Sequence, residues 1–171
     1  MPYLLHQIQH KSNWDRDPAA PRYLPEGEAP ADVVEDLRTE ENNLSVWHIE
    51  DNRSNLDRVI AALAAGRDFL QKFDFLLIDS QFLGEHGFKL HQIDGNSRDR
   101  HAAQNWHLHI VQISALGLGK LAELLFQSGE VVRKYEKQLE QLLRSAVDQG
   151  SLTLDDLKPK VREKVERAKS V

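Results

Sequence analysis

The clearest alternation of apolar and polar positions lies between residues 44 and 79. Residues 44–50 carry apolar side chains on both faces of an extended segment, which is typical of a strand covered on both sides. In residues 53–72 apolar positions recur at spacings of three and four, which predicts an amphipathic helix. Residues 73–79 are again mostly apolar. A helical crossover between two apolar strands predicts a right-handed parallel βαβ unit.

Three further strands are predicted outside this unit. Residues 2–9 indicate a short edge strand. Residues 88–94 and 106–113 indicate two strands that form a hairpin, because the polar loop between them has no apolar stripe. The sequence therefore predicts an α+β (or α/β) fold. We expect a small mixed sheet of four to five strands with one central βαβ crossover, a hairpin, and C-terminal helices packed on it.

The remaining helices are predicted near Pro30 and in the last third of the chain. A brief helix follows Pro30, and helical spacing resumes at Ser114. After Gly129 a second apolar stripe predicts a helix with a packing face, which we call the helix seam: Val132, Tyr135, Leu139, Leu142 and Ala146. A capping box of Thr153 and Asp156 precedes a last charged helix, which we expect Pro159 to start or kink.

The chain divides most simply into residues 1–150, a single globular domain, and residues 151–171, a charged helical tail. Four of the six prolines lie between positions 18 and 30, so residues 15–30 are predicted to form an irregular surface loop. Residues 1–43 hold nine acidic against four basic side chains, and residues 158–171 hold six basic against two acidic ones. Opposite charge at the two ends favours attraction within the molecule or between copies.

Composition excludes several classes of protein. An apolar fraction of 40% with 29% charged residues is typical of a globular chain and not of a disordered one. Without cysteine there is no disulfide, thiolate zinc site or thiol nucleophile. No apolar run has the length of a membrane span, and the first residues do not resemble a secretory signal, so a cytoplasmic protein is expected. A net charge of −5 disfavours nucleic acid as a partner, except through residues 158–171.

Three histidines form the first candidate site. His107 and His109 are two apart on a predicted strand, so they share a face. If the hairpin is centred on residue 100, His91 lies opposite His109. Such a trio, with Asp79 or Asp94 as a further ligand, predicts a site for a divalent metal such as zinc or iron. The alternative is that the histidines only mark the solvated end of a half-buried strand.

Acidic residues follow both strands of the βαβ unit. Asp51 and Asp79 would lie on one edge of the sheet with Glu50, where open α/β sheets hold their ligands. If the strand at 106–113 is antiparallel to the one at 73–79, His107 reaches the same edge. Asp51, Asp79 and His107 are therefore candidates for general acid–base or metal-assisted hydrolysis. The alternative is that Asp51 caps a helix and Asp79 begins a turn.

Candidate binding residues lie in the exposed loop and on the helix seam. The polar loop contributes Asn96, Arg98, Arg100 and His101, and the seam contributes Val132, Tyr135, Leu139 and Leu142. The segment at 117–120 resembles a phosphate loop only in part, because Ser114 and Leu121 occupy positions where that motif requires other residues.

Two functions follow from these features, and the sequence does not decide whether the protein is an enzyme. The first is a non-catalytic protein-interaction module, an accessory or regulatory subunit that uses the helix seam and exposed loops. Its partner would be another protein or a second copy of this chain. The alternative is a small metal-dependent hydrolase of a phosphoester or nucleic-acid substrate, with a His/Asp cluster at one rim of the sheet.

Overall fold

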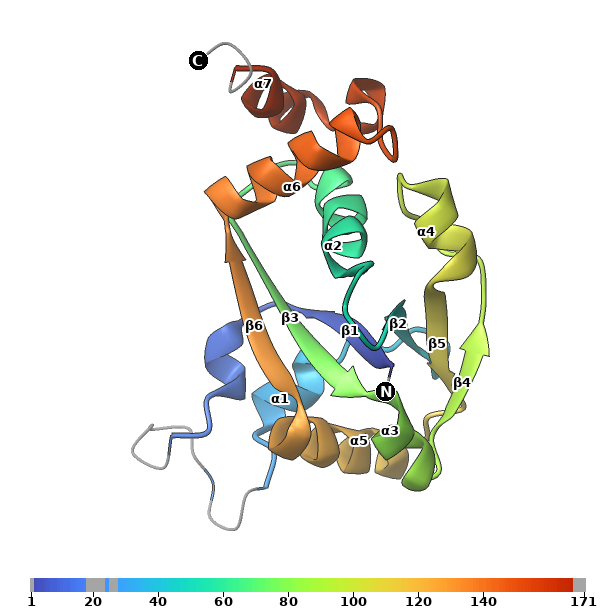
Figure 1. Ribbon diagram of the computed structural model, residues 1–171. Coiled ribbons are helices and arrows are strands. Elements are labelled where there is room, and N and C mark those ends of the chain that lie inside the picture. The colour runs from blue at the N-terminus through green and yellow to red at the C-terminus, as the bar shows by residue number, and fades with distance from the viewer. Residues whose placement is uncertain (1, 18–23, 25–27, 168–171) are drawn as a thin grey trace.

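The computed structural model describes residues 2–17, 24 and 28–167, and these form a six-stranded sheet with helices on both faces (Figure 1). The strands are β1 (Tyr3–Ile8), β2 (Leu44–Ile49), β3 (Lys72–Asp79), β4 (Lys89–Gln92), β5 (His107–Val111) and β6 (Glu130–Tyr135). Their order is β4-β5-β2-β1-β3-β6, and every neighbouring pair is antiparallel. The α+β prediction is confirmed, whereas the mixed sheet of four to five strands was wrong.

The predicted βαβ unit is split by β1. β2 and β3 run in the same direction, since each is antiparallel to β1, but β1 lies between them. Tyr3 of β1 is opposite both Ile49 and Asp79. β1 is thus a central strand and not the predicted edge strand. Its sequence fits that place, because the adjacent residues Leu4 and Leu5 point to opposite faces and are both fully buried.

The helices cover the two faces of the sheet (Figure 1). The α-helices are α1 (Ala31–Asp36), α2 (Leu56–Ala65), α3 (Ser80–Glu85), α4 (Arg100–Asn105), α5 (Ala115–Ser128), α6 (Glu136–Asp148) and α7 (Pro159–Arg167), with short 3-10 helices η1 (Lys11–Trp14) and η3 (Leu154–Asp156). α2, α6 and α7 pack on one face, which we call the first face. α1, α3 and α5 pack on the other, the second face. α4 lies in the connection between β4 and β5, which was predicted to be a plain loop.

The core of the first face is built on β3. Phe73 and Phe75 are fully buried under α6 and α7, with Val161 and Val165 of α7 also fully buried. The charged helix near the C-terminus is therefore part of the core and not a solvated extension. α7 begins at Pro159 as predicted, whereas the capping box at Thr153 forms at the start of the separate 3-10 helix η3 and not of α7.

A largely buried ion pair lies on the second face of β3, at Asp74, which is between Phe73 and Phe75 in the strand. Arg133 of β6 donates from Nε to Oδ1 of Asp74 at 2.6 Å, and the amide of Lys11 donates to Oδ2 at 3.0 Å. Burial alone would raise the pKa of Asp74, but the hydrogen bonds from Arg133 and Lys11 lower it below its ordinary value. The pair links the edge strand β6 to β3 and to the N-terminal segment.

The residues predicted as the helix seam do not form one helical face. Val132 and Tyr135 belong to β6, where Val132 lies opposite Phe75 of β3, and the helix begins only at Glu136. Leu139 is fully buried in the core of the first face and Leu142 packs against it. Helical spacing across residues 130–135 was therefore misleading, because a strand of alternating polarity can match an i, i+3 pattern over one turn.

Two other predictions are settled in part by the described residues. The helix after Pro30 forms as α1, with Pro30 at its N-cap. Most of the proline-rich loop predicted at 15–30 lies outside the described residues, which omit 18–23 and 25–27. Within the described part of the chain, no helix combines the length and apolar character needed to cross a membrane.

Candidate functional site

The three histidines share the first face of the sheet, at the end that α2, α6 and α7 leave open. His91 lies opposite His109 across β4 and β5, which is the register that the sequence predicted. His109 in turn lies opposite Ser45 of β2, and His107 lies opposite Trp47. Because cross-strand partners share a face, β4, β5 and β2 present His91, His109 and Ser45 as one polar row. His91 and Ser45 are exposed.

A cavity of about 410 Å³ opens beside this row, and we call it the histidine pocket. The strands line it on one side and the segment after β4 on the other. Its lining residues are His6, Gln7, Glu40, Ser45, Trp47, Leu63, Asp94, Gly95, Asn96, His107 and His109. The lining contains no Lys or Arg side chain to bind a phosphate.

Ser45 and His107 form a directed hydrogen bond in this pocket. Oγ of Ser45 lies 2.8 Å from Nε2 of His107, and Nδ1 of His107 lies 3.1 Å from the carbonyl oxygen of Ile93. A carbonyl oxygen only accepts, so Nδ1 of the neutral ring carries the proton. Nε2 therefore accepts the hydroxyl proton of Ser45. A serine, a base and a group that orients the base are the parts of an activated nucleophile.

Burial keeps His107 in the form that this hydrogen bond requires. His107 is only 7% exposed, and this burial lowers its pKa below the ordinary value. The hydrogen bond to the Ile93 carbonyl acts in the opposite direction, and the neighbouring His109 lowers the pKa further. The ring is therefore neutral near pH 7, with a lone pair on Nε2 that faces an exposed hydroxyl.

The position of the His107 ring is fixed by close packing. Its centroid lies 4.8 Å from that of Trp47. Gly95 approaches from the segment after β4, and a Cβ added there would lie 2.7 Å from Cγ of His107. Only glycine leaves room for the ring at this distance. On the far side of the serine, Nδ1 of His6 donates to the carbonyl oxygen of Ser45 at 2.9 Å.

The predicted three-histidine metal site is not supported by this geometry. Both ring nitrogens of His107 are used in hydrogen bonds within the protein. Among residues 2–17, 24 and 28–167, no group of three or more His, Asp or Glu side chains is placed to hold a metal ion. The three histidines lie near one another on β4 and β5 as predicted, and His107 is hydrogen-bonded to Ser45.

The predicted acidic rim does not come together with His107. Asp79 is opposite Tyr3 at the end of β3, which is three strands away from β5, about 14 Å at the ordinary strand spacing. Its carboxylate caps α3 by accepting from the amides of Gln81 and Phe82. Asp51 lies in the turn after β2. Neither lines the histidine pocket.

The predicted recognition loop is partly structural. Asp99 in its centre is buried, caps α4 at Ala102, and accepts from Nε of Arg58 in α2 at 2.6 Å. Burial alone would raise the pKa of Asp99, but the hydrogen bonds from Arg58 and the α4 amides lower it. The predicted binding residues around it are all exposed: Asn96, Arg98, Arg100 and His101. Of these, Asn96 lines the histidine pocket.

Comparison of the chain with protein-family models, with curated proteins and with solved structures found no match.

Ser45 is the site residue that the sequence did not reveal. It has no motif around it, and its partner lies 62 positions away in the chain. Strand alternation puts Ser45 on the same face of β2 as Trp47, although nothing in the sequence singled Ser45 out, and the predicted hairpin placed His107 and His109 on one face. The missing information was that β5 pairs with β2, because strand neighbours distant in sequence are set by the whole sheet.

Proposed function

We propose that the protein is a hydrolase that cleaves a carboxylic ester with Ser45 as nucleophile and His107 as general base. The observation that carries the proposal is the hydrogen-bonded series from Ser45 Oγ through His107 to the Ile93 carbonyl. It supplies an accessible hydroxyl, a neutral base within reach of it, and a group that fixes the tautomer of the base. The metal-dependent alternative drawn from the sequence is thereby replaced by metal-independent chemistry with one of the same histidines.

The reaction divides into two steps around an acyl-serine. Ser45 Oγ attacks the ester carbonyl carbon while its proton moves to Nε2 of His107. As the carbon–oxygen bond breaks, His107 gives this proton to the leaving alcohol, and the acyl group remains on Ser45. Water then attacks the acyl carbon, with its proton passing to Nε2. The proton returns to Ser45 Oγ as the carboxylic acid is released.

The lining of the pocket favours a carboxylic ester over a phosphoester. Phosphoryl transfer requires cations around the phosphate, and the lining residues include no Lys or Arg. Glu40 and Asp94, which also line the pocket, repel an anionic substrate. Gln7 and Asn96 line the same cavity, and we assign their side-chain amides as the donors to the oxyanion of the tetrahedral adduct.

The first experiment is covalent labelling with a fluorophosphonate probe, followed by mass spectrometry of the peptides. We expect labelling on Ser45, and we expect it to be lost in Ser45→Ala. His107→Asn should reduce labelling by about a thousandfold, because asparagine keeps a donor for the Ile93 carbonyl but has no base at the Nε2 position. Ser128→Ala and His10→Gln are matched controls at exposed positions outside the pocket. Labelling that persists in folded Ser45→Ala would contradict the proposal.

The second experiment is the pH dependence of turnover of a chromogenic acetate ester. Ser45 is activated only while His107 is neutral, so kcat/KM should rise with pH through a pKa below 6.5, the ordinary value for histidine, and then level. The direction follows from the burial of His107, which lowers its pKa. A rate that keeps rising through pH 8 would indicate ordinary hydroxide attack and not this histidine.

A further inference from the structure

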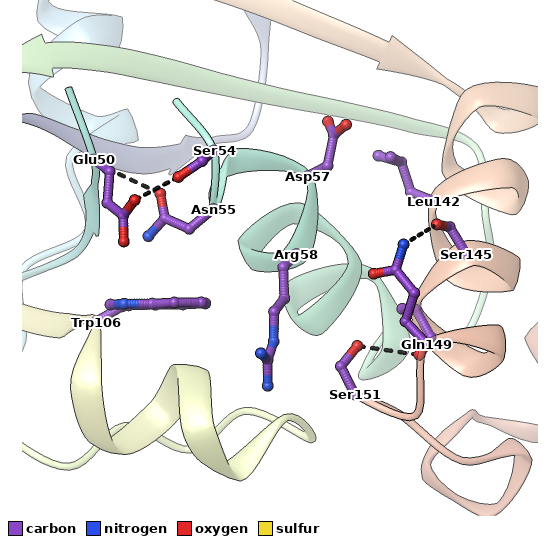
Figure 2. A pocket seen from close by; sticks show the side chains of 11 residues that line it. Glu50, Ser54, Asn55, Asp57, Arg58, Trp106, Leu142, Ser145, Gln149 and Ser151 are labelled. Atoms are coloured by element: carbon purple, nitrogen blue, oxygen red, sulfur yellow. Dashed lines mark hydrogen bonds between the residues drawn. The ribbon is translucent and has the colours of Figure 1, made fainter. Parts of the chain in front are cut away.

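A second cavity, of about 430 Å³, lies at the junction of the β2–α2 turn, the α4–β5 boundary and the C-terminal end of α6 (Figure 2). Its lining residues are Glu50, Ser54, Asn55, Asp57, Arg58, Trp106, Leu142, Ser145, Ala146, Gln149 and Ser151. None of them lines the histidine pocket. The cavity is therefore independent of the proposed hydrolase chemistry.

The cavity keeps an excess of negative charge. Its one cation, Arg58, donates from Nε and Nη2 to both oxygens of Asp99, at 2.6 and 3.1 Å, and Asp99 lies outside the lining. The positive charge of Arg58 is therefore paired with Asp99, which lies outside the cavity. Glu50 accepts a hydrogen bond from Ser54, and neither Glu50 nor Asp57 has a cationic side chain as partner in the described part of the chain. Two carboxylates remain to attract a cation.

An aromatic ring, Trp106, lies near Glu50, whereas Asp57 lies farther from it (Figure 2). Figure 2 shows the indole of Trp106 nearly edge-on, with Glu50 on one side of the ring plane and Arg58 on the other. Arg58 Cζ is 5.4 Å from the ring centroid, and His101 packs edge-to-face against the same ring at 5.0 Å. Glu50 and Asn55, which both line the cavity, lie on the side of the ring plane away from the Arg58 guanidinium (Figure 2). A cation there contacts the negative face of the ring and the carboxylate together.

We infer that this cavity binds the guanidinium group of an arginine side chain. A guanidinium is planar, so it can stack on the Trp106 indole while its edge donates two hydrogen bonds to a carboxylate such as Glu50. The ammonium group of lysine is not planar, and it cannot donate two parallel hydrogen bonds to one carboxylate. Free arginine is the weaker ligand, because the lining has no uncommitted cation to pair with its α-carboxylate. The ligand is therefore an arginine within a peptide of a partner protein.

The experiment is a titration of the full ¹⁵N-labelled chain, followed through the tryptophan indole N–H signals. The signal of Trp106 is assigned by its loss in Trp106→Phe. The probe is Nα-acetyl-arginine N-methylamide, and the controls are its citrulline analogue, which is similar in shape and uncharged, its lysine analogue, and free arginine. We expect a saturable shift of the Trp106 signal in the millimolar range with the arginine amide. Lysine amide and free arginine should bind more weakly, and the citrulline amide should give no saturable shift.

Variants connect the binding to this cavity. Glu50→Gln retains an acceptor for Ser54 and should weaken binding about tenfold, the effect of one charge-assisted pair. Glu123→Gln removes the same charge from α5 on the second face and should leave binding unchanged, as should Ser45→Ala in the other pocket. An equal response to the citrulline amide, equal weakening by Glu123→Gln, or the absence of any saturable shift in the folded protein would overturn the inference.

Discussion

The first face of the sheet is used in two different ways along its width. Over β1 and β3 it carries Leu5, Phe73 and Phe75, which are fully buried in the core beneath α2, α6 and α7. Over β2, β5 and β4 it carries Ser45, His109 and His91, and these side chains reach a cavity or solvent. Both halves follow the same alternation of side chains. The difference is which helices lie above them, so one half became the core and the other the candidate site.

We call the part of the first face over β1 and β3 the covered half, and the part over β2, β5 and β4 the open half. Truncating a buried side chain of the covered half tests this difference most strongly. Phe75→Ala should lower the free energy of unfolding by about 3–5 kcal/mol, because the side chain is fully buried and the helices above it cannot collapse into the space. His91→Ala in the open half should change it by less than about 0.5 kcal/mol, since that residue is exposed. Urea denaturation measures both. Similar losses for the two variants would mean that the open half is also covered.

The second test cuts the link between the halves. Asp99 holds α4, above the open half, to Arg58 of α2, above the covered half. Asp99→Ala removes this ion pair and the cap of α4, and should cost about 3 kcal/mol of stability. Hydrogen exchange should quicken in α4 more than in α6. Asp155→Ala breaks an ion pair of Arg162 in which the Asp155 side chain is 89% exposed, and should cost less than about 0.5 kcal/mol.

The third test changes a residue that packs against His107 in the open half. Gly95→Ala places a methyl group against the His107 ring and should cost about 1–3 kcal/mol, with a large loss of fluorophosphonate labelling at Ser45. Gly119→Ala in α5 meets no atom within 4 Å and should stabilise the protein slightly, because alanine favours the helix. Unchanged labelling in Gly95→Ala would show that the position of His107 does not control Ser45.

The smallest effect expected is on the pH dependence of stability. Burial lowers the pKa of both His6 and His107, so the unfolded chain binds more protons than the folded one below about pH 6.5. Stability is fully present above that pH and falls as the pH drops toward the lowered pKa values. The slope is at most about 1.4 kcal/mol per pH unit for each histidine.

His6→Asn tests this account of the acid sensitivity. Asparagine retains a donor for the Ser45 carbonyl but does not titrate, so the slope should fall by about half if the two histidines contribute equally. The slope is obtained from unfolding midpoints in urea measured between about pH 4.5 and 7.5. An unaltered slope in His6→Asn would assign the acid sensitivity to other groups.

Several elements were predictable because their determinants are local. The apolar stripe of α2, the capping box at Thr153 and the start of α7 at Pro159 each depend on residues a few positions apart. The pairing of His91 with His109 was predictable too, since a hairpin fixes register from its own centre. The strand β6 was missed because Val132 and Tyr135 match a helical stripe, and only pairing with β3 makes that segment extended.

The sequence by itself determined which side chains share a face within each strand or helix, because the backbone repeat is intrinsic to the chain. It thus grouped His107 with His109, and Ser45 with Trp47. Only the tertiary structure decided that β5 lies beside β2, that β1 enters between β2 and β3, and that a cavity opens beside His107 and His109. These choices depend on packing among segments far apart in the chain. As a result, Ser45, which no sequence motif marks, lies within hydrogen-bond distance of the buried His107.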